Sequence, residues 1–486
     1  MLGRKRTYAL LAALCLSAII AGCAGPTPVP AATDAPAPTE AAPAATDAPA
    51  ATDAPAATDA PAATEEAPTE AAPEGLDVDP SGQSIVFWHA MSSGDLLEGM
   101  DTLVEEFNTT NEWGITVEAV AQGSQSELET AVNGAITTGE LPNLTMGFAN
   151  GLVLWHSLGV IAPLNQYLDD PTFGLSEEEI AAIYPGPYNL GTLPDGTQVG
   201  IPMHQSAQVI FYNHTWAEEL GFPDPPATSA EFKEQACAAA AANNEDDNPD
   251  NDGTGGYVYF PDASMVSPWI WAFDGTYLNE AGDAYDLNNQ AVVDVALFLK
   301  DLVDNGCTLT TPSFPNPEFA GRLALFATSS TAGMPFQQTA MEEAGNEDEW
   351  GAIPFPGPNG TLAVDAFGQM IGVVQTNPEA DLASWLFLRW LTSPETQAKW
   401  VEATGYFPSQ TTTDVGTRPE DDPIWAGALE LLPLGQAEPN LAAHGAVRGA
   451  IRDAFFAILE APDEAGVVAV LDELNNTAAD LVAEIQ

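Results

Sequence analysis

Residues 199–213, VGIPMHQSAQVIFYN, decide the fold. Gly200-Ile201-Pro202 ends one segment, and Val209-Ile210-Phe211-Tyr212 is an apolar run of β-branched and aromatic residues that is typical of a buried strand. Residues 203–208 between them form an irregular stretch without an acidic or basic charge at neutral pH. Such a stretch suits a chain that leaves one lobe and enters another. It predicts that the backbone here and Ser206 face the gap between two lobes.

The segments before this crossing alternate between strand-like and helix-like patterns. A chain of 486 residues exceeds one ordinary hydrophobic core, so we expect two lobes. The alternation predicts an α/β fold in which each lobe is a mainly parallel sheet flanked by helices. One expected helix opens with the capping-box spacing of Ser126 and Glu129 and stops at Gly139. The expected elements are strands at 84–89, 115–121 and 144–148 and helices at 96–107 and 126–138.

Two further crossings are expected. Residues 367–374 look like a return to the first lobe, and a third crossing should follow Tyr406. Rotation about three crossings would open a cleft without unpacking either core, so they would form a hinge. The first lobe would comprise 83–206 and 369–408, and the second lobe 207–368 and 409–486. Expected elements after the first crossing are a helix capped by Thr228, strands at 256–260 and 322–328, and helices at 292–303, 382–390, 395–404, 441–460 and 464–485.

The first 82 residues carry export and tether signals. Arg4-Lys5-Arg6, the apolar run 8–20 and a lipobox ending in Cys23 predict a lipoprotein signal peptide at 1–22, with Cys23 as the lipidated residue. The alternative is an ordinary signal peptide. Residues 23–82, built from ATDAPA-type repeats, predict a disordered tether because they offer little surface to bury. We therefore expect an exported protein that is held at the outer face of the cytoplasmic membrane by its lipid.

Charge restricts the partners. Eleven Lys and Arg residues against 70 Asp and Glu residues give a formal net charge of −59. So acidic a surface argues against nucleic acid or anionic lipid as a partner. The excess of acidic residues would suit a protein from a saline habitat. It would equally serve to keep an exported protein soluble.

Two cysteines remain once Cys15 and Cys23 are assigned to the signal and the lipobox. An even pair in an exported protein predicts one disulfide, between Cys237 and Cys307. It would join two expected helices of the second lobe. The alternative is two separate buried thiols.

Motifs of enzymes are missing from the sequence. HExxH, GxSxG, a P-loop and CxxC do not occur, and the five His residues lie far apart. With 70 carboxylates no acid–base pair stands out, so a glycan-active hydrolase has no positive support. The loop with Asn248, Asp250 and Asp252 resembles the first half of a Ca²⁺-binding loop, but position 12 is Tyr259 instead of Glu. It is either a structural calcium site or a solvated acidic turn, and no other cofactor is expected.

Five motifs resemble the bacterial extracellular solute-binding proteins (family 1) of ABC importers for sugars and glycerol phosphate. They are Phe87-Trp88-His89-Ala90-Met91, Thr138-Gly139-x-x-Pro142, the crossing at 200–213, Thr404-Gly405-Tyr406-Phe407-Pro408 and Ala446-Val447-Arg448. The resemblance implies a periplasmic-binding-protein-like fold of type II with three interlobe crossings. It also implies a monomer without enzymatic activity, with an ABC permease as its partner.

Aromatic side chains supply one set of candidate ligand contacts. Trp88 and His89 end the first strand, and parallel sheets place ligand sites at the carboxyl ends of strands. Trp269, Trp271 and Phe273 follow a strand of the second lobe, and aromatic rings stack on the C–H face of a sugar or polyol. For each of these aromatic rings the alternative is packing in a core.

Arg448 is the strongest single candidate, because a guanidinium fork suits bidentate oxygens. The resemblance implies that it holds a sugar hydroxyl or a phosphate, and the alternative is a salt bridge to a neighbouring Glu. Sugar binders usually carry aromatics just before this Arg, whereas His444 and Gly445 stand here and favour a smaller or phosphorylated ligand. Other residues that match ligand contacts of the family's glycerol-3-phosphate binders are Ser126 or Glu127, Ser206, Ser329 or Ser330, Gly368 and Tyr406.

Together these patterns predict a lipid-anchored receptor that captures a carbohydrate or a glycerol-3-phosphate-like solute by hinge closure and delivers it to a permease. The alternatives are a secreted glycan-active hydrolase and an adhesive lipoprotein without a transport role. A hydrolase would turn over oligosaccharides, and an adhesive protein would not be stabilised by a small molecule.

Overall fold

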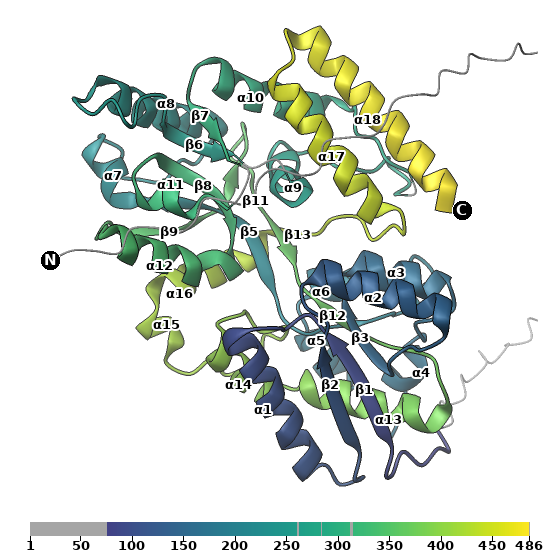
Figure 1. Cartoon of the computed structure of the whole chain (residues 1–486). Helices are drawn as coiled ribbons and strands as arrows, with labels where there is room; N and C mark the ends of the chain where they lie inside the picture. The colour runs from purple at the N-terminus through teal and green to yellow at the C-terminus, as the bar shows by residue number, and fades with distance from the viewer. Residues whose placement is uncertain (1–74, 260–261, 283, 312–313, 486) are drawn as a thin grey trace, which may run out of the picture. The chain divides into compact units, whose positions relative to one another are not determined.

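The computed structural model describes residues 75–259, 262–282, 284–311 and 314–485. The expected signal peptide, Cys23 and residues 24–74 of the expected tether lie outside these ranges. The described chain forms two β-sheets, each flanked by helices (Figure 1). We call the part around the sheet that contains β1 the first lobe, and the part around the other sheet the second lobe. The α/β fold with two lobes is confirmed.

The sheet of the first lobe has the strand order β2-β1-β3-β12-β4. β1 (Ser84–His89) pairs in parallel with β2 (Thr116–Ala121) and β3 (Leu144–Gly147). β12 (Met370–Val373) runs antiparallel to both β3 and β4 (Ile201–Pro202). The sheet is therefore mainly parallel, as expected: β2, β1, β3 and β4 run in one direction, and only β12, which enters from the second lobe, runs in the opposite direction.

The helix α2 (Gln125–Thr138) begins with a capping box formed by Ser124 and Glu127. The Glu127 carboxylate accepts a hydrogen bond from the Ser124 N–H at 2.7 Å. The expected box, Ser126 with Glu129, is wrong because two Ser-x-x-Glu spacings overlap here and the helix starts at the earlier one. The other first-lobe helices are α1 (Gly94–Thr110), α3 (Ala149–Ser157), α4 (Asn165–Leu168), α5 (Glu177–Ala182), α6 (Pro185–Leu190), α13 (Pro378–Leu391) and α14 (Pro394–Thr404).

The sheet of the second lobe is mixed rather than mainly parallel, with the order β10-β11-β5-β8-β6-β7 and with β13 and β9 added to β11 and β5. β6 is parallel to β7 and β8, whereas β5 is antiparallel to β8, β9 and β11. The strands are β5 (Ser206–Asn213), β6 (Gly255–Tyr259), β7 (Thr308–Thr310), β8 (Ala324–Ser330), β9 (Trp350–Ile353), β10 (Phe355–Pro356), β11 (Leu362–Phe367) and β13 (Gly435–Gln436).

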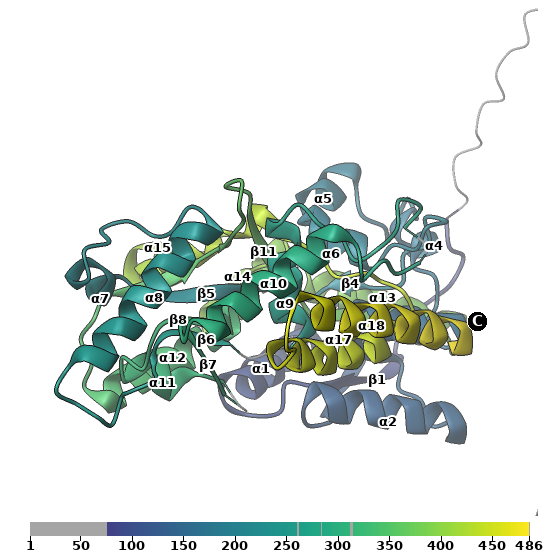
Figure 2. The ribbon, with the colours of Figure 1, turned by 90° about the horizontal axis from the view of Figure 1, so that it is seen from above.

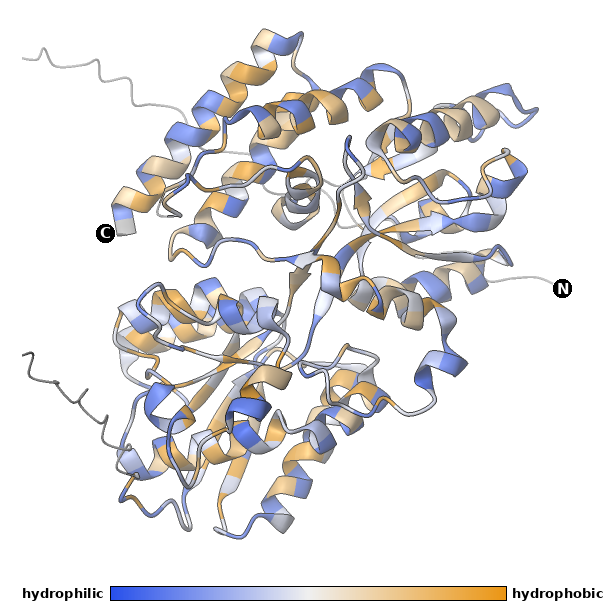
Figure 3. Cartoon of the chain, turned by 180° about the vertical axis from the view of Figure 1, so that it is seen from behind, coloured by the Kyte–Doolittle hydropathy of each residue, from blue (hydrophilic) through white to orange (hydrophobic). Residues whose placement is uncertain are grey.

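Helices cover both faces of this second sheet (Figures 1 and 2). Because side chains alternate along β5, Ile210 and Tyr212 join one apolar core and Val209 and Phe211 join another. Apolar residues also line the sheet-facing sides of the helices (Figure 3). The helices are α7 (His214–Glu219), α8 (Ser229–Glu245), α9 (Ala263–Ala272), α10 (Gln290–Asp304), α11 (Asn316–Ala320), α12 (Met334–Ala344), α15 (Arg418–Asp421), α16 (Pro423–Leu429), α17 (His444–Leu459) and α18 (Glu464–Ile485).

Across the described ranges, every helix is too short or too polar to traverse a lipid bilayer. The predicted cap of α8 is confirmed, since Thr228 and Glu231 form a capping box. Strand β5 begins at Ser206, so the irregular stretch between β4 and β5 is shorter than expected.

The folded part begins earlier than residue 83, the first residue of the expected lobe. The Leu76 N–H donates to Asp170 Oδ2 at 2.6 Å. Leu76 and Val78 pack against the core of the first lobe. These two larger apolar side chains interrupt the Ala, Pro and Thr composition of the tether, and they give the chain something to bury.

The passages between the two sheets lie against one another. A Cβ at Gly368, between β11 and β12, would lie 2.1 Å from the carbonyl oxygen of His204, which lies between β4 and β5. The Gln205 N–H donates to the Phe407 carbonyl at 2.9 Å and the Phe407 N–H donates to the Gln205 carbonyl at 3.2 Å, which joins a third passage to the first. Gly368 is therefore required by a close backbone approach.

The disulfide between Cys237 and Cys307 is confirmed. Cys237 belongs to α8, and Cys307 follows α10 directly before β7, with a Cα–Cα distance of 4.6 Å. The bond closes a loop with a sequence separation of 70 residues, so it restricts the unfolded chain substantially.

Breaking this disulfide should destabilise the second lobe by about 2–4 kcal/mol, because the unfolded chain regains the entropy of that loop. Thermal unfolding with and without a reducing agent measures the effect. The double variant Cys237→Ser with Cys307→Ser is the control, since its unfolding temperature should already be low and should not respond to the reducing agent. Equal unfolding temperatures for wild type and double variant would contradict the prediction.

Gly368→Ala should destabilise the protein by about 1–3 kcal/mol, because the added methyl group would collide with the His204 carbonyl. Urea unfolding measures the change. The control is Gly427→Ala in α16, where an added Cβ meets no atom within 4 Å and should be neutral or slightly stabilising. If Gly368→Ala were as stable as the control, the two backbone segments at Gly368 and His204 could move apart without cost, and the prediction would be wrong.

Candidate ligand-binding site

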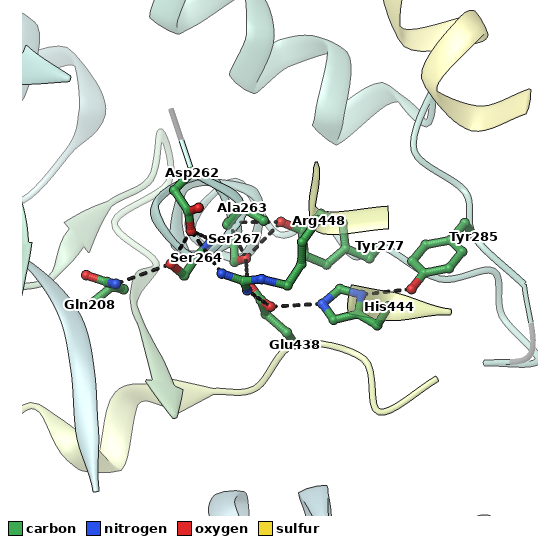
Figure 4. A network of polar contacts seen from close by, with 10 residues as sticks. All are labelled: Gln208, Asp262, Ala263, Ser264, Ser267, Tyr277, Tyr285, Glu438, His444 and Arg448. Carbon is green, nitrogen blue, oxygen red and sulfur yellow. Dashed lines mark hydrogen bonds and ion pairs between the residues drawn. The ribbon is translucent and has the colours of Figure 1, made fainter. Parts of the chain in front are cut away.

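Arg448 on α17 is held by two carboxylates (Figure 4). Its Nη1 pairs with Glu438 Oε2, and its Nη2 lies 2.9 Å from Asp262 Oδ1. The side chains of Arg448 and Asp262 are 31% and 33% exposed, so the cluster reaches the surface on one side. In this structure Arg448 therefore forms the salt bridge to a Glu that was the alternative to ligand binding, and it pairs with an Asp as well.

Glu438 continues the network into the second lobe (Figure 4). It accepts hydrogen bonds from His444 Nε2 at 2.8 Å and Ser267 Oγ at 2.9 Å. His444 Nδ1 lies 2.7 Å from the Tyr285 hydroxyl, which suits the tautomer with the proton on Nε2. Burial favours the protonated form of Glu438, but Arg448 and His444 outweigh burial and hold the pKa of this carboxyl below its ordinary value.

Asp365 on β11 lies close enough to this network to interact with its charges, and it has no partner of its own. It is 1% exposed, and neither carboxyl oxygen makes a hydrogen bond. Burial raises its pKa well above the ordinary value; Glu438 and Asp262 raise the pKa further, and Arg448 opposes them. Asp365 is paired in register with Gln208 of β5, whose Nε2 donates to Ser264 Oγ at 3.2 Å.

Asp262, Asp365 and Glu438 were not predicted as site residues. A charged residue inside an otherwise apolar strand, as in the Leu362–Phe367 sequence LAVDAF, is a signal that could have indicated Asp365. Asp262 and Glu438 give no comparable signal, because they are two of 70 acidic residues. Asp262 also lies far from both Glu438 and Arg448 in the sequence.

The predicted aromatic platform lies in the core. Trp269 is 0% exposed and packs against Phe232 and Phe355, with ring centroids 5.2 and 5.1 Å apart. Trp271 is also buried, and Phe273 is half-buried against the same core. Every residue of α9 is buried, so its aromatic rings point into packed surroundings on all sides. The core-packing alternative describes these residues.

The predicted first-lobe contacts have different environments. Trp88 is half-buried and packs against the first-lobe core. His89 is buried, and burial lowers its pKa to about 4, although Asp101 opposes the shift. Ser126 is exposed on α2, and the Glu127 carboxylate is used by the capping box.

The predicted serines and Tyr406 lie at the passages between the sheets. Ser206 is buried, and its Oγ lies 3.0 Å from Thr331 Oγ1. Ser329 and Ser330 follow the expected strand at 322–328, but in the structure they are the last two residues of β8. The Tyr406 ring lies 4.0 Å from the ring of His204, whose pKa burial lowers to about 3.

Two surface hollows lie away from the Arg448 network. One, of about 520 Å³, is lined by Tyr406, Thr331 and Trp425 among others. The other, of about 480 Å³, lies on the first lobe between α1 and α13. Neither is lined by Arg448, Glu438 or Asp365, so the polar network rather than a hollow is the strongest candidate site.

In the loop with Asn248, Asp250 and Asp252, the side chains of Asn248 and the preceding Asp246 stabilise local turns. Asn248 Oδ1 accepts from the Asp250 N–H at 3.3 Å, and Asp246 Oδ1 accepts from the Asn248 N–H at 2.7 Å. Within the described part of the chain, no three His, Cys, Asp or Glu side chains are arranged to hold a metal ion.

Arg448→Met should destabilise the protein by about 1–3 kcal/mol at neutral pH, because Glu438 and Asp262 lose their cation. The native pKa of Glu438 lies below its unfolded value, so the stabilising effect of the pair is present above the unfolded pKa and is lost as the pH falls. Urea unfolding at several pH values should therefore show that the free energy of unfolding of the wild type exceeds that of the variant, and that this difference shrinks as the pH falls from about 5 to about 2.

The matched control is Arg452→Met, one turn further along α17, where the side chain is 49% exposed and pairs with the exposed Asp453. It should change stability little at any pH. The assignment of the Arg448 pairs would be contradicted if both variants lost the same free energy of unfolding, or if the loss for Arg448→Met did not change with pH.

Residues 102–426 match the family described as bacterial extracellular solute-binding protein. The maltotriose-binding protein of Pyrococcus abyssi is 22% identical over 407 residues, which cover 80% of each chain. The sn-glycerol-3-phosphate-binding periplasmic protein of Salmonella typhimurium is 22% identical over 340 residues, which cover 68% of this chain and 74% of that protein. A binding protein of Brucella abortus is 23% identical over 281 residues, and this match spans 64% of its length and 56% of this chain.

The fold is shared with solved structures. The cyclic alpha-maltosyl-1,6-maltose binding protein from Arthrobacter globiformis superposes with a TM-score of 0.69 at 20% identity, over 82% of this chain and 99% of that chain. At this identity the likeness establishes the two-lobed fold. The family match covers well over half of the 486 residues. The chain therefore belongs to the bacterial extracellular solute-binding protein family.

Proposed function

We propose that this protein is the substrate-binding component of an ABC importer. It captures a carbohydrate or a glycerol-3-phosphate-like solute between its lobes and delivers the solute to a permease. The observation that carries the proposal is the pair of sheets joined by closely packed passages, in a chain of the solute-binding family. Relatives named for binding maltotriose and glycerol 3-phosphate support this ligand class.

The mechanism is differential affinity rather than a reaction. Rotation about the passages would bring the lobes together, and a ligand that contacts both lobes would favour the closed arrangement. The second lobe would contribute the network around Arg448, whose carboxylates are held by hydrogen bonds and ion pairs before the ligand arrives. A preorganised network of this kind loses little side-chain entropy on binding.

Export and anchoring complete the proposal. The lipobox at Cys23 supports attachment to the outer face of the cytoplasmic membrane through a lipid. The repeats that follow Cys23 would act as an extended tether that lets a monomeric receptor reach its permease.

Isothermal titration of the purified protein with maltose, maltotriose, sorbitol and glycerol 3-phosphate tests this function. At least one of these solutes should bind saturably and should raise the unfolding temperature, because a ligand at 100 times its Kd adds about 2.7 kcal/mol of stability. Oligosaccharide recovered after incubation should be unchanged. Accumulation of shorter sugars would indicate a hydrolase, and a lack of stabilisation by every solute would contradict solute capture.

A further inference from the structure

The carboxyl group of Asp365 is buried without a hydrogen-bond partner. Asp365 is 1% exposed in the middle of β11, and both of its oxygens are unpaired. A buried polar group without a partner destabilises the folded state by about 1–3 kcal/mol, and proteins rarely keep one without a use for it. The group therefore requires an explanation beyond folding.

A second unpaired acceptor lies beside it. Gln208 is the register partner of Asp365 on the neighbouring strand, and its Oε1 is also buried without a partner, whereas its Nε2 donates to Ser264. Both positions are close to the passages between the lobes, since β5 begins at Ser206 and β11 ends at Phe367. Because burial raises the pKa of Asp365, its carboxyl group keeps a proton and can donate as well as accept, whereas Gln208 Oε1 can only accept. A ligand hydroxyl group, which both donates and accepts, matches this pair at the end of the sheet.

The charges around Asp365 oppose an anion. Glu438 and Asp262 pair with both terminal nitrogens of Arg448, so two carboxylates face one guanidinium. A phosphate placed here would have to compete with both carboxylates for that guanidinium. A hydroxyl group carries no charge and can donate to either unpaired acceptor.

We propose that Asp365 and Gln208 bind ligand hydroxyl groups, and that the ligand is an uncharged, hydroxyl-rich saccharide or polyol rather than a phosphorylated compound. Arg448 is then a positioning residue that holds Glu438 and Asp262. The partly exposed Asp262 and Arg448 mark the side from which the ligand approaches. This inference rests on the proposed function and narrows its ligand class.

Asp365→Leu tests the inference in the full protein, by titration with maltose, maltotriose, sorbitol and glycerol 3-phosphate. The wild type should bind a neutral solute more tightly than glycerol 3-phosphate. The variant should bind that neutral solute at least tenfold more weakly, because a site built to pair with a hydroxyl loses that partner. Without ligand, its unfolding temperature should equal or exceed that of the wild type, because a buried acid is removed. A purely structural residue would instead be destabilised by the change.

Asp480→Leu is the matched control, since Asp480 is an exposed aspartate on α18 of the same lobe and the change should alter neither affinity nor stability. Asp365→Ser is the second variant, and it should also weaken binding. Unchanged affinity in both Asp365 variants, or tighter binding of glycerol 3-phosphate than of every neutral solute, overturns the inference and leaves solute capture intact. If the wild type binds none of the four solutes, the proposed function fails, and the inference fails with it.

Discussion

The close approach of two backbone segments is the constraint on which the two-lobed arrangement depends. Gly368 lies so near the His204 carbonyl that no side chain fits between the outgoing and returning passages. The third passage is joined to the first by reciprocal backbone hydrogen bonds between Gln205 and Phe407. Three segments from distant parts of the chain therefore meet in one narrow region, where small backbone rotations can move one sheet relative to the other.

The polar network at the candidate site is organised around one cation. Arg448 draws Glu438 and Asp262 together, and Glu438 in turn holds Ser267 and His444. This network is satisfied internally, whereas Asp365 and the Gln208 carbonyl group are not. In our proposal the paired groups build the site and the unpaired groups contact the ligand, so Arg448, although it is the conspicuous cation, is not the main contact.

Local patterns in the sequence were sufficient for much of the fold. Strand β1 has the expected limits, and the cap of α8 and the Cys237–Cys307 bond follow from short-range or compositional signals. Strand direction could not be predicted in the same way, because it depends on which sheet a returning segment joins. Two overlapping capping boxes at the start of α2 are equivalent in sequence, and only tertiary structure distinguishes them.

The candidate site was predicted less completely, for a related reason. An aromatic residue such as Trp269 has the same local pattern in a core and at a binding surface, and its neighbours Phe232 and Phe355 come from distant segments. Asp262, Asp365 and Glu438 likewise acquire their significance from one another, and acidic residues are too common in this chain to stand out. Sequence patterns located Arg448, but its partners depend on the fold.

The hydrogen bond from Leu76 to Asp170 has a mechanical consequence. It attaches the start of the described chain to the first lobe. A force applied to the residues before Leu76 would therefore act on that lobe and not on the second lobe, which contains Arg448. If the upstream chain anchors the protein, as we propose, the first lobe would be the attached part and the second lobe would be the one that moves. In that arrangement a force on the anchor would load the first lobe and would leave the polar network around Arg448 undisturbed.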